Sequence, residues 1–118
     1  MTELIALLSS GKGTWAEVAA LIKSMPWEKV FLITDGFGKE KFHVDEKSEL
    51  IVVDFTSNVF TLRNELKEKL KGKINDLEVA LHLGSGNGKE HMALLSALLG
   101  LGIGFRLVTI GQKGFEEL

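Results

Sequence analysis

Five apolar runs, separated by segments with helical periodicity, constrain the fold of this chain more than any other feature. The runs show almost no polar alternation and cover residues 4–8, 30–33, 50–55, 77–83 and 105–110. A strand with one face in water alternates apolar and polar residues, whereas a strand buried on both faces is a continuous apolar run. The sequence therefore predicts an α/β, Rossmann-like three-layer fold, in which helices cover both faces of a mainly parallel five-stranded sheet.

Three helices and one irregular connection are predicted between the runs. The first helix begins at Thr14, and the third follows a glycine-rich turn after the fourth run. The second covers residues 59–70, with Ser57 or Asn58 as its N-cap. The segment 36–48 is too polar and too short for a covering helix, so we expect a small hairpin or an irregular crossover there. For the sheet we expect the common strand order 3-2-1-4-5.

The size and composition of the chain indicate one domain over residues 1–118. A chain of 118 residues, 45% of them hydrophobic, builds one core and leaves no room for a second. Its net charge of −2 argues against a grip on long nucleic acid. The absence of cysteine excludes disulfides, thiolate zinc sites and a cysteine nucleophile. Abundant lysine and glutamate with a single glutamine are typical of a thermophilic source.

The N-terminus and the apolar stretches indicate a cytoplasmic protein. Residues 1–3 lack the basic region of a secretory signal and lead at once into an apolar strand pattern. The longest apolar stretch, residues 97–105, is too short to cross a bilayer, which requires about 20 residues. We therefore expect no membrane partner.

A glycine-rich turn stands between the fourth run and the third helix. Three glycines within five positions allow positive φ angles and close approach to a ligand, and the amides and dipole of the helix start attract anions. Lys89 in the first helical turn opposes the helix dipole, which is easier to understand if it neutralises a bound phosphate. The predicted ligand-binding residues here are Gly84, Ser85, Gly86, Asn87, Gly88 and Lys89.

A second glycine-containing loop follows the first run. In the order 3-2-1-4-5, strands one and four are neighbours and the winding reverses between them, which opens a crevice at their carboxyl ends. Both loops would bring hydroxyls, amides and a lysine to that crevice. The second set of predicted ligand-binding residues is Ser9, Ser10, Gly11, Lys12, Gly13 and Thr14. We therefore expect a small anionic nucleotide to bind where the two loops meet.

Two other classes of function stay open. Gly11, Gly13 and Ala16 match the dinucleotide fingerprint G-x-G-x-x-A, and Asp35 ends the second run at a spacing suitable for a ribose hydroxyl. Because no catalytic domain fits in this length, that pattern favours a dinucleotide-binding regulatory module rather than a dehydrogenase. In the third class, the chain is a structural or partner-binding protein whose glycine loops only form turns.

The segment 84–97 resembles the fourth-strand turn and helix of CARF domains, the Rossmann-like sensors of CRISPR systems. In that family a turn rich in glycine and threonine leads through a lysine into an apolar helix. Residues 4–11 and the helix from Thr14 are similar to the family's first motif. The chain departs from the family pattern at Asn87, where a small glycine or threonine is usual, in the short crossover after the second run, and in lacking an effector domain.

The resemblance implies a homodimer that binds cyclic oligoadenylate across its axis, with no metal and no cofactor. Some such domains are ring nucleases that cleave their ligand. In the cleavage hypothesis a ribose 2′-hydroxyl attacks its own phosphate, Lys89 stabilises the added charge, and Ser10 or Ser85 orients the phosphate. A dimer would also cover the third helix, whose residues 92–99 leave almost no polar face.

The three histidines carry weaker signals, and their spacing matches no zinc site. His91 is a candidate proton carrier, although its place in the first helical turn suggests a side chain in solvent. His82, near the end of the fourth run, is interpreted as a buried histidine with its hydrogen bonds satisfied. His43 is expected at the surface.

Overall fold

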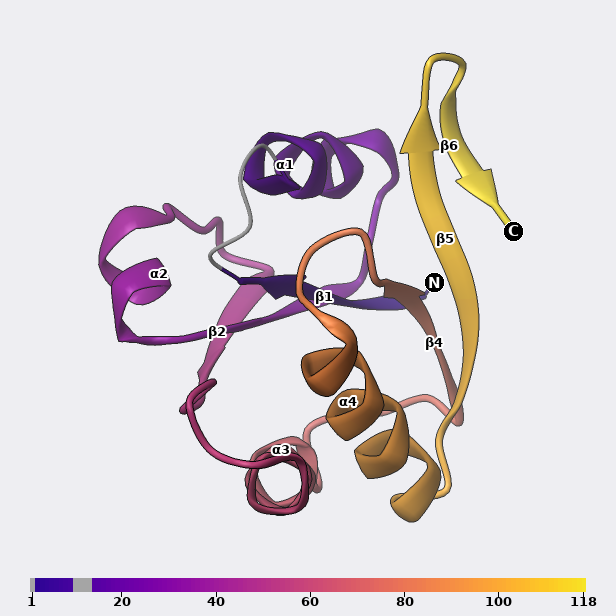
Figure 1. The fold of residues 1–118 in the computed structure, drawn as a ribbon. Coiled ribbons are helices and arrows are strands. Elements are labelled where there is room, and N and C mark those ends of the chain that lie inside the picture. Colours follow the sequence, from indigo (N-terminus) through magenta and orange to yellow (C-terminus); the bar gives the residue numbers. More distant parts are fainter. Residues whose placement is uncertain (1, 10–13) are drawn as a thin grey trace.

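The computed structural model describes residues 2–9 and 14–118 as an α/β fold with one six-stranded sheet (Figure 1). The strand order is β3-β2-β1-β4-β5-β6, and the first five strands run parallel while β6 is antiparallel to β5. The elements are β1 (Glu3–Leu8), α1 (Thr14–Ser24), β2 (Lys29–Thr34), α2 (Gly36–Lys41), β3 (Ser48–Val52), α3 (Val59–Leu70), β4 (Glu78–His82), α4 (Gly88–Gly100), β5 (Gly104–Gly111) and β6 (Gly114–Glu117). The predicted fold class and the order 3-2-1-4-5 are confirmed.

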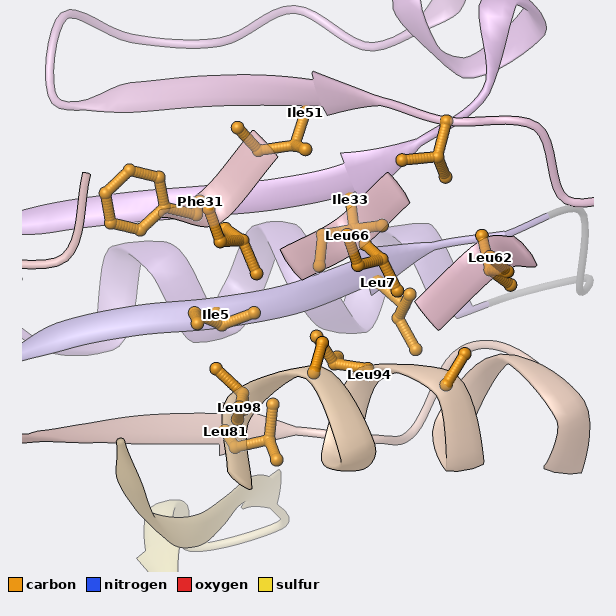
Figure 2. Close-up of a cluster of buried hydrophobic side chains, with 14 of the residues drawn as sticks. Ile5, Leu7, Phe31, Ile33, Ile51, Leu62, Leu66, Leu81, Leu94 and Leu98 are labelled. Atoms are coloured by element: carbon orange, nitrogen blue, oxygen red, sulfur yellow. The ribbon is translucent and has the colours of Figure 1, made fainter. Parts of the chain in front are cut away.

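Burial on both faces explains why the central strands are uninterrupted apolar runs. In β1, Ile5 and Leu7 point to the core beneath α3 and α4 (Figure 2). Leu4, Ala6 and Leu8 belong to a second core beneath α1. All five side chains are fully buried. Both sides of a parallel sheet must be covered, and here α1 covers one face while α3 and α4 together cover the other.

The apolar residues of α3 lie on the face of the helix that packs against the sheet. Its Leu62, Leu66 and Leu70 recur every four residues, and they are buried against the sheet and α4. Asn58 is the N-cap, because its side-chain oxygen accepts a hydrogen bond of 2.8 Å from the Thr61 amide. Of the two predicted caps, Asn58 is therefore correct.

The connection after β2 contains a six-residue helix, α2, so the expected hairpin is wrong. Asp35 caps this helix, because its Oδ1 accepts from the Gly38 amide at 2.9 Å. Gly38 lies so close to β2 that a Cβ there would come within 1.8 Å of Thr34 Oγ1. Sequence reasoning did not predict α2, because it treats a glycine as a turn former. Gly38 instead lets the helix pack closely against β2. The irregular crossover alternative holds only for residues 42–47, which lie outside any helix or strand.

The hairpin of β5 and β6 adds a sixth strand to the five that were predicted. Gly114 has φ of +99°, which favours glycine, and it follows the two-residue turn that joins the strands. Phe115 on β6 packs edge-on against Trp27, with ring centroids 5.7 Å apart. A four-residue edge strand with two glutamates has no apolar run, and so its sequence gave no strand signal.

Two strand boundaries also differ from the predictions. The third strand ends at Val52 and leaves residues 53–58 as a loop, although the apolar run continues to Phe55. The fourth strand begins at Glu78, and the preceding Leu77 is 85% exposed. None of the helices within residues 14–118 has the length and hydropathy to span a membrane.

Candidate functional site

Ser9, which directly follows β1, meets Ser85, in the turn after β4, at the carboxyl edge of the sheet. The two strands are hydrogen-bonded neighbours, with Ala6 of β1 opposite His82 of β4. Just beyond them, the Ser9 amide donates a hydrogen bond of 3.1 Å to Ser85 Oγ, and both residues are buried. Because the winding of the sheet reverses between β1 and β4, this bond lies at the place where open α/β sheets bind ligands.

Several predicted ligand-binding residues lie outside the described part of the chain. These are Ser10, Gly11, Lys12 and Gly13. Thr14 begins α1. The hypothesis of Ser10 as a phosphate-orienting group, and the dinucleotide fingerprint at Gly11 and Gly13, therefore remain predictions.

The turn before α4 holds its backbone by internal hydrogen bonds. Gly86 has φ of +100°, a conformation that disfavours any other residue. Asn87 and Glu90 form a capping box: Asn87 Oδ1 accepts from the Glu90 amide at 2.9 Å, and Glu90 Oε1 accepts from the Asn87 amide at 3.1 Å. These bonds satisfy two of the amides at the helix start. The amides of Gly88 and Lys89 have no hydrogen-bond acceptor among the described residues.

Lys89 points to a neighbouring loop. Its Nζ donates to the carbonyl oxygens of Phe55 at 2.6 Å and Ser57 at 2.8 Å, both in the loop between β3 and α3. Two carbonyl acceptors compensate an ammonium group whose place in the first turn opposes the helix dipole. The position of Lys89 is thus explained without a bound phosphate.

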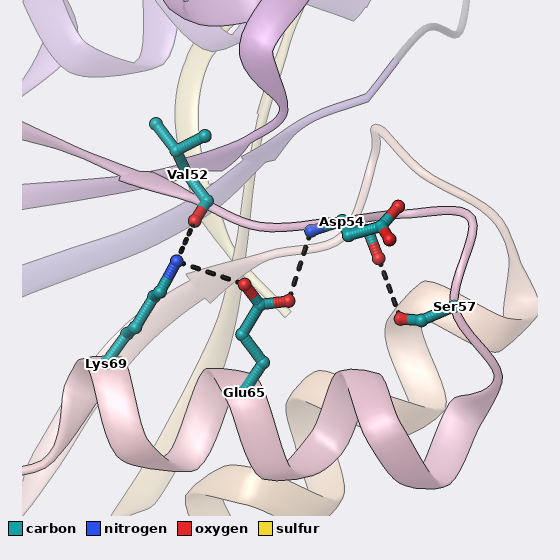
Figure 3. Close-up of polar contacts among 5 residues, drawn as sticks. All are labelled: Val52, Asp54, Ser57, Glu65 and Lys69. Carbon is teal, nitrogen blue, oxygen red and sulfur yellow. Dashed lines mark hydrogen bonds and ion pairs between the residues drawn. The ribbon is translucent and has the colours of Figure 1, made fainter.

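The loop that Lys89 contacts is also held from the other side, by α3. Lys69 donates to the carbonyl of Val52, and Glu65 accepts from the Asp54 amide at 3.1 Å (Figure 3). Hydrogen bonds from the side chain and amide of Thr56 hold the pKa of the Asp54 carboxyl below its ordinary value, and the charge of Lys89 lowers this pKa further. Side chains of α3 and Lys89 of α4 therefore hold residues 53–58 from two sides.

Two other predicted residues are also engaged. Asp35 accepts the capping bond from the Gly38 amide described above, so one of its carboxylate oxygens is occupied. His91 lies against the turn, where its Nε2 is 2.8 Å from the carbonyl oxygen of Ser85. The ring is half-buried, and the expectation of a side chain in solvent is wrong. His43 is exposed, as expected.

His82 is buried as expected, but its hydrogen bonds are not satisfied. Only 1% of the residue is exposed, and neither ring nitrogen has a hydrogen-bond partner among the described residues. Nε2 lies 3.8 Å from Glu17 Oε1 of α1. Burial lowers the pKa of His82 below the ordinary 6.5, and the nearby carboxylate of Glu17 only partly opposes this shift. Sequence reasoning missed the contact between Glu17 and His82, because no local spacing relates α1 to the end of β4.

Gly84 lies directly on the His82–Glu17 pair. A Cβ at this position would stand 2.6 Å from both Cε1 and Nε2 of His82 and 3.2 Å from Glu17 Oε2. By contrast, a Cβ at Gly88 would meet nothing within 4 Å. Glycine is required at position 84 for close packing on the imidazole, which is a reason that the sequence motif does not reveal.

Comparison with protein families and with curated proteins finds no match to this chain. Within the described ranges, no three histidine, aspartate or glutamate side chains come together as they would around a metal ion.

Proposed function

We propose that this protein binds a small anionic nucleotide in the crevice between the ends of β1 and β4. The observation that carries the proposal is the hydrogen bond from the Ser9 amide to Ser85 Oγ, at 3.1 Å, which fastens two glycine-containing loops at the switch point of the sheet. The CARF resemblance favours cyclic oligoadenylate as the ligand. The crevice then serves as a sensor site.

The anion would be held by backbone amides more than by a lysine. The amides of Gly88 and Lys89 begin a 13-residue helix, and the capping box leaves them available. A helix of this length concentrates partial positive charge at its first turn, where a phosphate oxygen is stabilised. Lys89 Nζ would reach the same phosphate only by releasing the carbonyls of Phe55 and Ser57. Ligand binding through Lys89 would therefore loosen residues 53–58.

A homodimer agrees with the exposed apolar side chains of α3 and α4. Phe60 on α3 and Met92 on α4 are 64% and 63% exposed, and Leu99 at the end of α4 is 69% exposed. A groove of about 250 Å³ on this face is lined by residues of both helices, including Phe60 and Met92. Apolar side chains that gather on one face are typical of a contact surface. In the proposal, a second copy covers this face and the ring lies across the dimer axis.

Cleavage of the ligand is a further step of the proposal and needs no metal. The 2′-oxygen of a ribose forms a bond to the adjacent phosphorus, the bond from phosphorus to the 5′-oxygen breaks, and the proton of the 2′-hydroxyl passes to the leaving 5′-oxygen. The products are a 2′,3′-cyclic phosphate and a 5′-hydroxyl. Amides at the start of α4, joined by Lys89 once it is released, would stabilise the added negative charge.

Native mass spectrometry tests the proposal. The pure protein is mixed in turn with cyclic tetra-adenylate, cyclic hexa-adenylate and NAD, and the ligand mass is followed over time. A dimer that retains one intact ring supports a sensor, and the appearance of linear products supports a ring nuclease. Retention of NAD alone favours the dinucleotide alternative, with Asp35 at the ribose. If no nucleotide binds, the proposed function is wrong and the partner-binding alternative gains support.

A further inference from the structure

An exposed aromatic side chain stands just beyond the carboxyl end of β2. This is Phe37, the second residue of α2, and 59% of it is exposed. The helix that carries it has a fixed place on the sheet, because a Cβ at Gly38 would come within 1.8 Å of Thr34 Oγ1. Asp35 also caps this helix through the Gly38 amide. The backbone of Phe37 is therefore held close to the sheet, while most of the residue remains exposed.

Two further aromatic rings support Phe37. Trp15 of α1 lies with its ring centroid 6.1 Å from that of Phe37, at an interplanar angle of 53°. Phe42 packs edge-on against the same indole, with centroids 6.0 Å apart. Trp15 and Phe42 are half-buried and pack against the core beneath α1. Aromatic pairs at such distances attract one another beyond the effect of area burial, so these contacts stabilise the position of the Phe37 ring.

Trp15 connects this aromatic group to the crevice between β1 and β4. Its Nε1 donates a hydrogen bond of 2.5 Å to the carbonyl oxygen of Ser9. The amide of the same Ser9 donates to Ser85 Oγ in the turn before α4. In Figure 1, α2 lies on the side of the molecule where β1 ends. Phe37 and the turn before α4 are thus both linked to Ser9, at the carboxyl edge of the sheet.

A lysine beside Phe37 gives the aromatic surface a positive charge. Lys41 Nζ lies 5.9 Å from the centroid of the Phe37 ring, which is within the range of a cation–π interaction. Lys41 is exposed and, within residues 2–9 and 14–118, forms no ion pair with a carboxylate. Proteins that bind single-stranded nucleotides combine an aromatic ring for stacking with a cation for the phosphate. An uncharged aromatic ligand would use only the ring.

We propose that the Phe37 ring stacks on a heteroaromatic base of the bound nucleotide and that Lys41 contacts the phosphate next to this base. The inference rests on the proposed function, in which another phosphate of the same ligand lies at the start of α4. A ligand with more than one nucleotide suits this arrangement, because the two contacts are linked to different groups of Ser9. Every base has a flat π face, so the stacking itself does not select adenine.

The test is titration with cyclic tetra-adenylate of variants at three exposed positions. Phe37→Ala removes the ring, Phe37→Trp replaces it with a larger one that stacks and fluoresces, and Lys41→Gln removes the charge. Leu77→Ala and Leu77→Trp are the matched controls. Leu77 is 85% exposed and precedes β4, so it lies at the amino edge of the sheet, opposite to Phe37. Affinity is measured by calorimetry, and tryptophan emission is recorded in parallel titrations.

We expect Phe37→Ala to bind cyclic tetra-adenylate at least about tenfold more weakly than the wild type, the effect of losing one stacked base. Phe37→Trp should bind at least as tightly as the wild type, and a base stacked on the introduced indole should quench its emission. Lys41→Gln should reduce the slope of the logarithm of the affinity against the logarithm of the salt concentration by about 0.7. Both Leu77 variants should bind like the wild type, and the indole introduced in Leu77→Trp should keep its emission.

Different results overturn the inference and the proposed function. If the wild type binds cyclic tetra-adenylate while Phe37→Ala binds equally well, the stacking surface is wrong and the proposed function stands. The same holds if the emission of Phe37→Trp is quenched no more than that of Leu77→Trp. An unchanged salt dependence of Lys41→Gln would exclude the phosphate contact. If the wild type binds no cyclic tetra-adenylate, the stacking surface and the cyclic oligoadenylate function fail together.

Discussion

The two ends of the turn between β4 and α4 are built in opposite ways. At the α4 end, the side chains of Asn87, Lys89, Glu90 and His91 are engaged with protein groups. At the β4 end, His82 is buried beneath Gly84, and within residues 2–9 and 14–118 neither of its ring nitrogens has a hydrogen-bond partner. The charged end is thus the one whose side chains the protein already uses. Among the described residues, the groups without hydrogen-bond partners are the amides of Gly88 and Lys89 at one end and the ring nitrogens of His82 at the other.

The largest expected effect is a difference in stability between alanine variants of Gly84 and Gly88. Gly84→Ala places a methyl group 2.6 Å from the His82 ring, which is too buried to move aside, so we expect a loss of about 1–3 kcal/mol in the free energy of unfolding. Gly88→Ala meets open space and should change stability by less than about 0.5 kcal/mol. Urea unfolding measures both. Equal effects would contradict the close packing at Gly84.

Removal of the bond between the loops should have the next largest effect. Ser85→Ala leaves the buried amide of Ser9 without its acceptor, and we expect a loss of about 1–2 kcal/mol in the free energy of unfolding. Ser96→Ala on α4 is a control at a half-buried serine. The comparison is made by urea unfolding. A Ser85→Ala protein as stable as the Ser96→Ala control would show that the two loops are not fastened by this bond.

A smaller effect is expected from Lys89. Lys89→Met keeps the aliphatic stem but removes the bonds to Phe55 and Ser57, and partial exposure limits the loss to about 1 kcal/mol. Hydrogen exchange should increase mainly in residues 53–58. The control is Lys23→Met on α1, a lysine near the C-terminal end of its helix. Unchanged hydrogen exchange in residues 53–58 would mean that Lys89 does not hold this loop. Lys89 would then be free to bind a phosphate.

The smallest effect concerns pH. The pKa of His82 is lower in the folded protein than the ordinary 6.5 of an unfolded chain, so the unfolded state takes up a proton first as the pH falls. Stability contributed by neutral His82 is present above about pH 6.5 and is lost below it, down to the pKa of the folded state. The unfolding midpoint of the wild type should therefore decrease more steeply below pH 6.5 than that of His82→Leu. Parallel curves would contradict the shift.

The fold was predictable because burial on both faces leaves a direct trace in the sequence. The uninterrupted runs 4–8 and 77–83 indicated central parallel strands, and β1 and β4 are the central pair. The meeting of Ser9 with Ser85 followed from the strand order. The edge strand β6 and the short helix α2 were not predicted. Neither contains an apolar run or a repeated pattern of apolar residues.

The chemistry of the crevice was less predictable than its place. Lys89 was expected to face a phosphate because it is charged and follows three glycines, but its acceptors come from the loop after β3, which no local spacing relates to α4. His82 was expected to have satisfied hydrogen bonds, since most buried histidines do. Its partner Glu17 and the packing of Gly84 depend on tertiary contacts that only the folded chain defines.

Calorimetric titration of cyclic tetra-adenylate tests the central claim most directly, namely that the loops joined by Ser9 and Ser85 form a nucleotide site. The wild type, Ser85→Ala and a control, Ser24→Ala at the end of α1, are titrated at a temperature where all three are folded. We expect one ring per dimer for the wild type and Ser24→Ala, and at least about tenfold weaker binding for Ser85→Ala. No binding by the wild type, or equal binding by all three proteins, would contradict the claim.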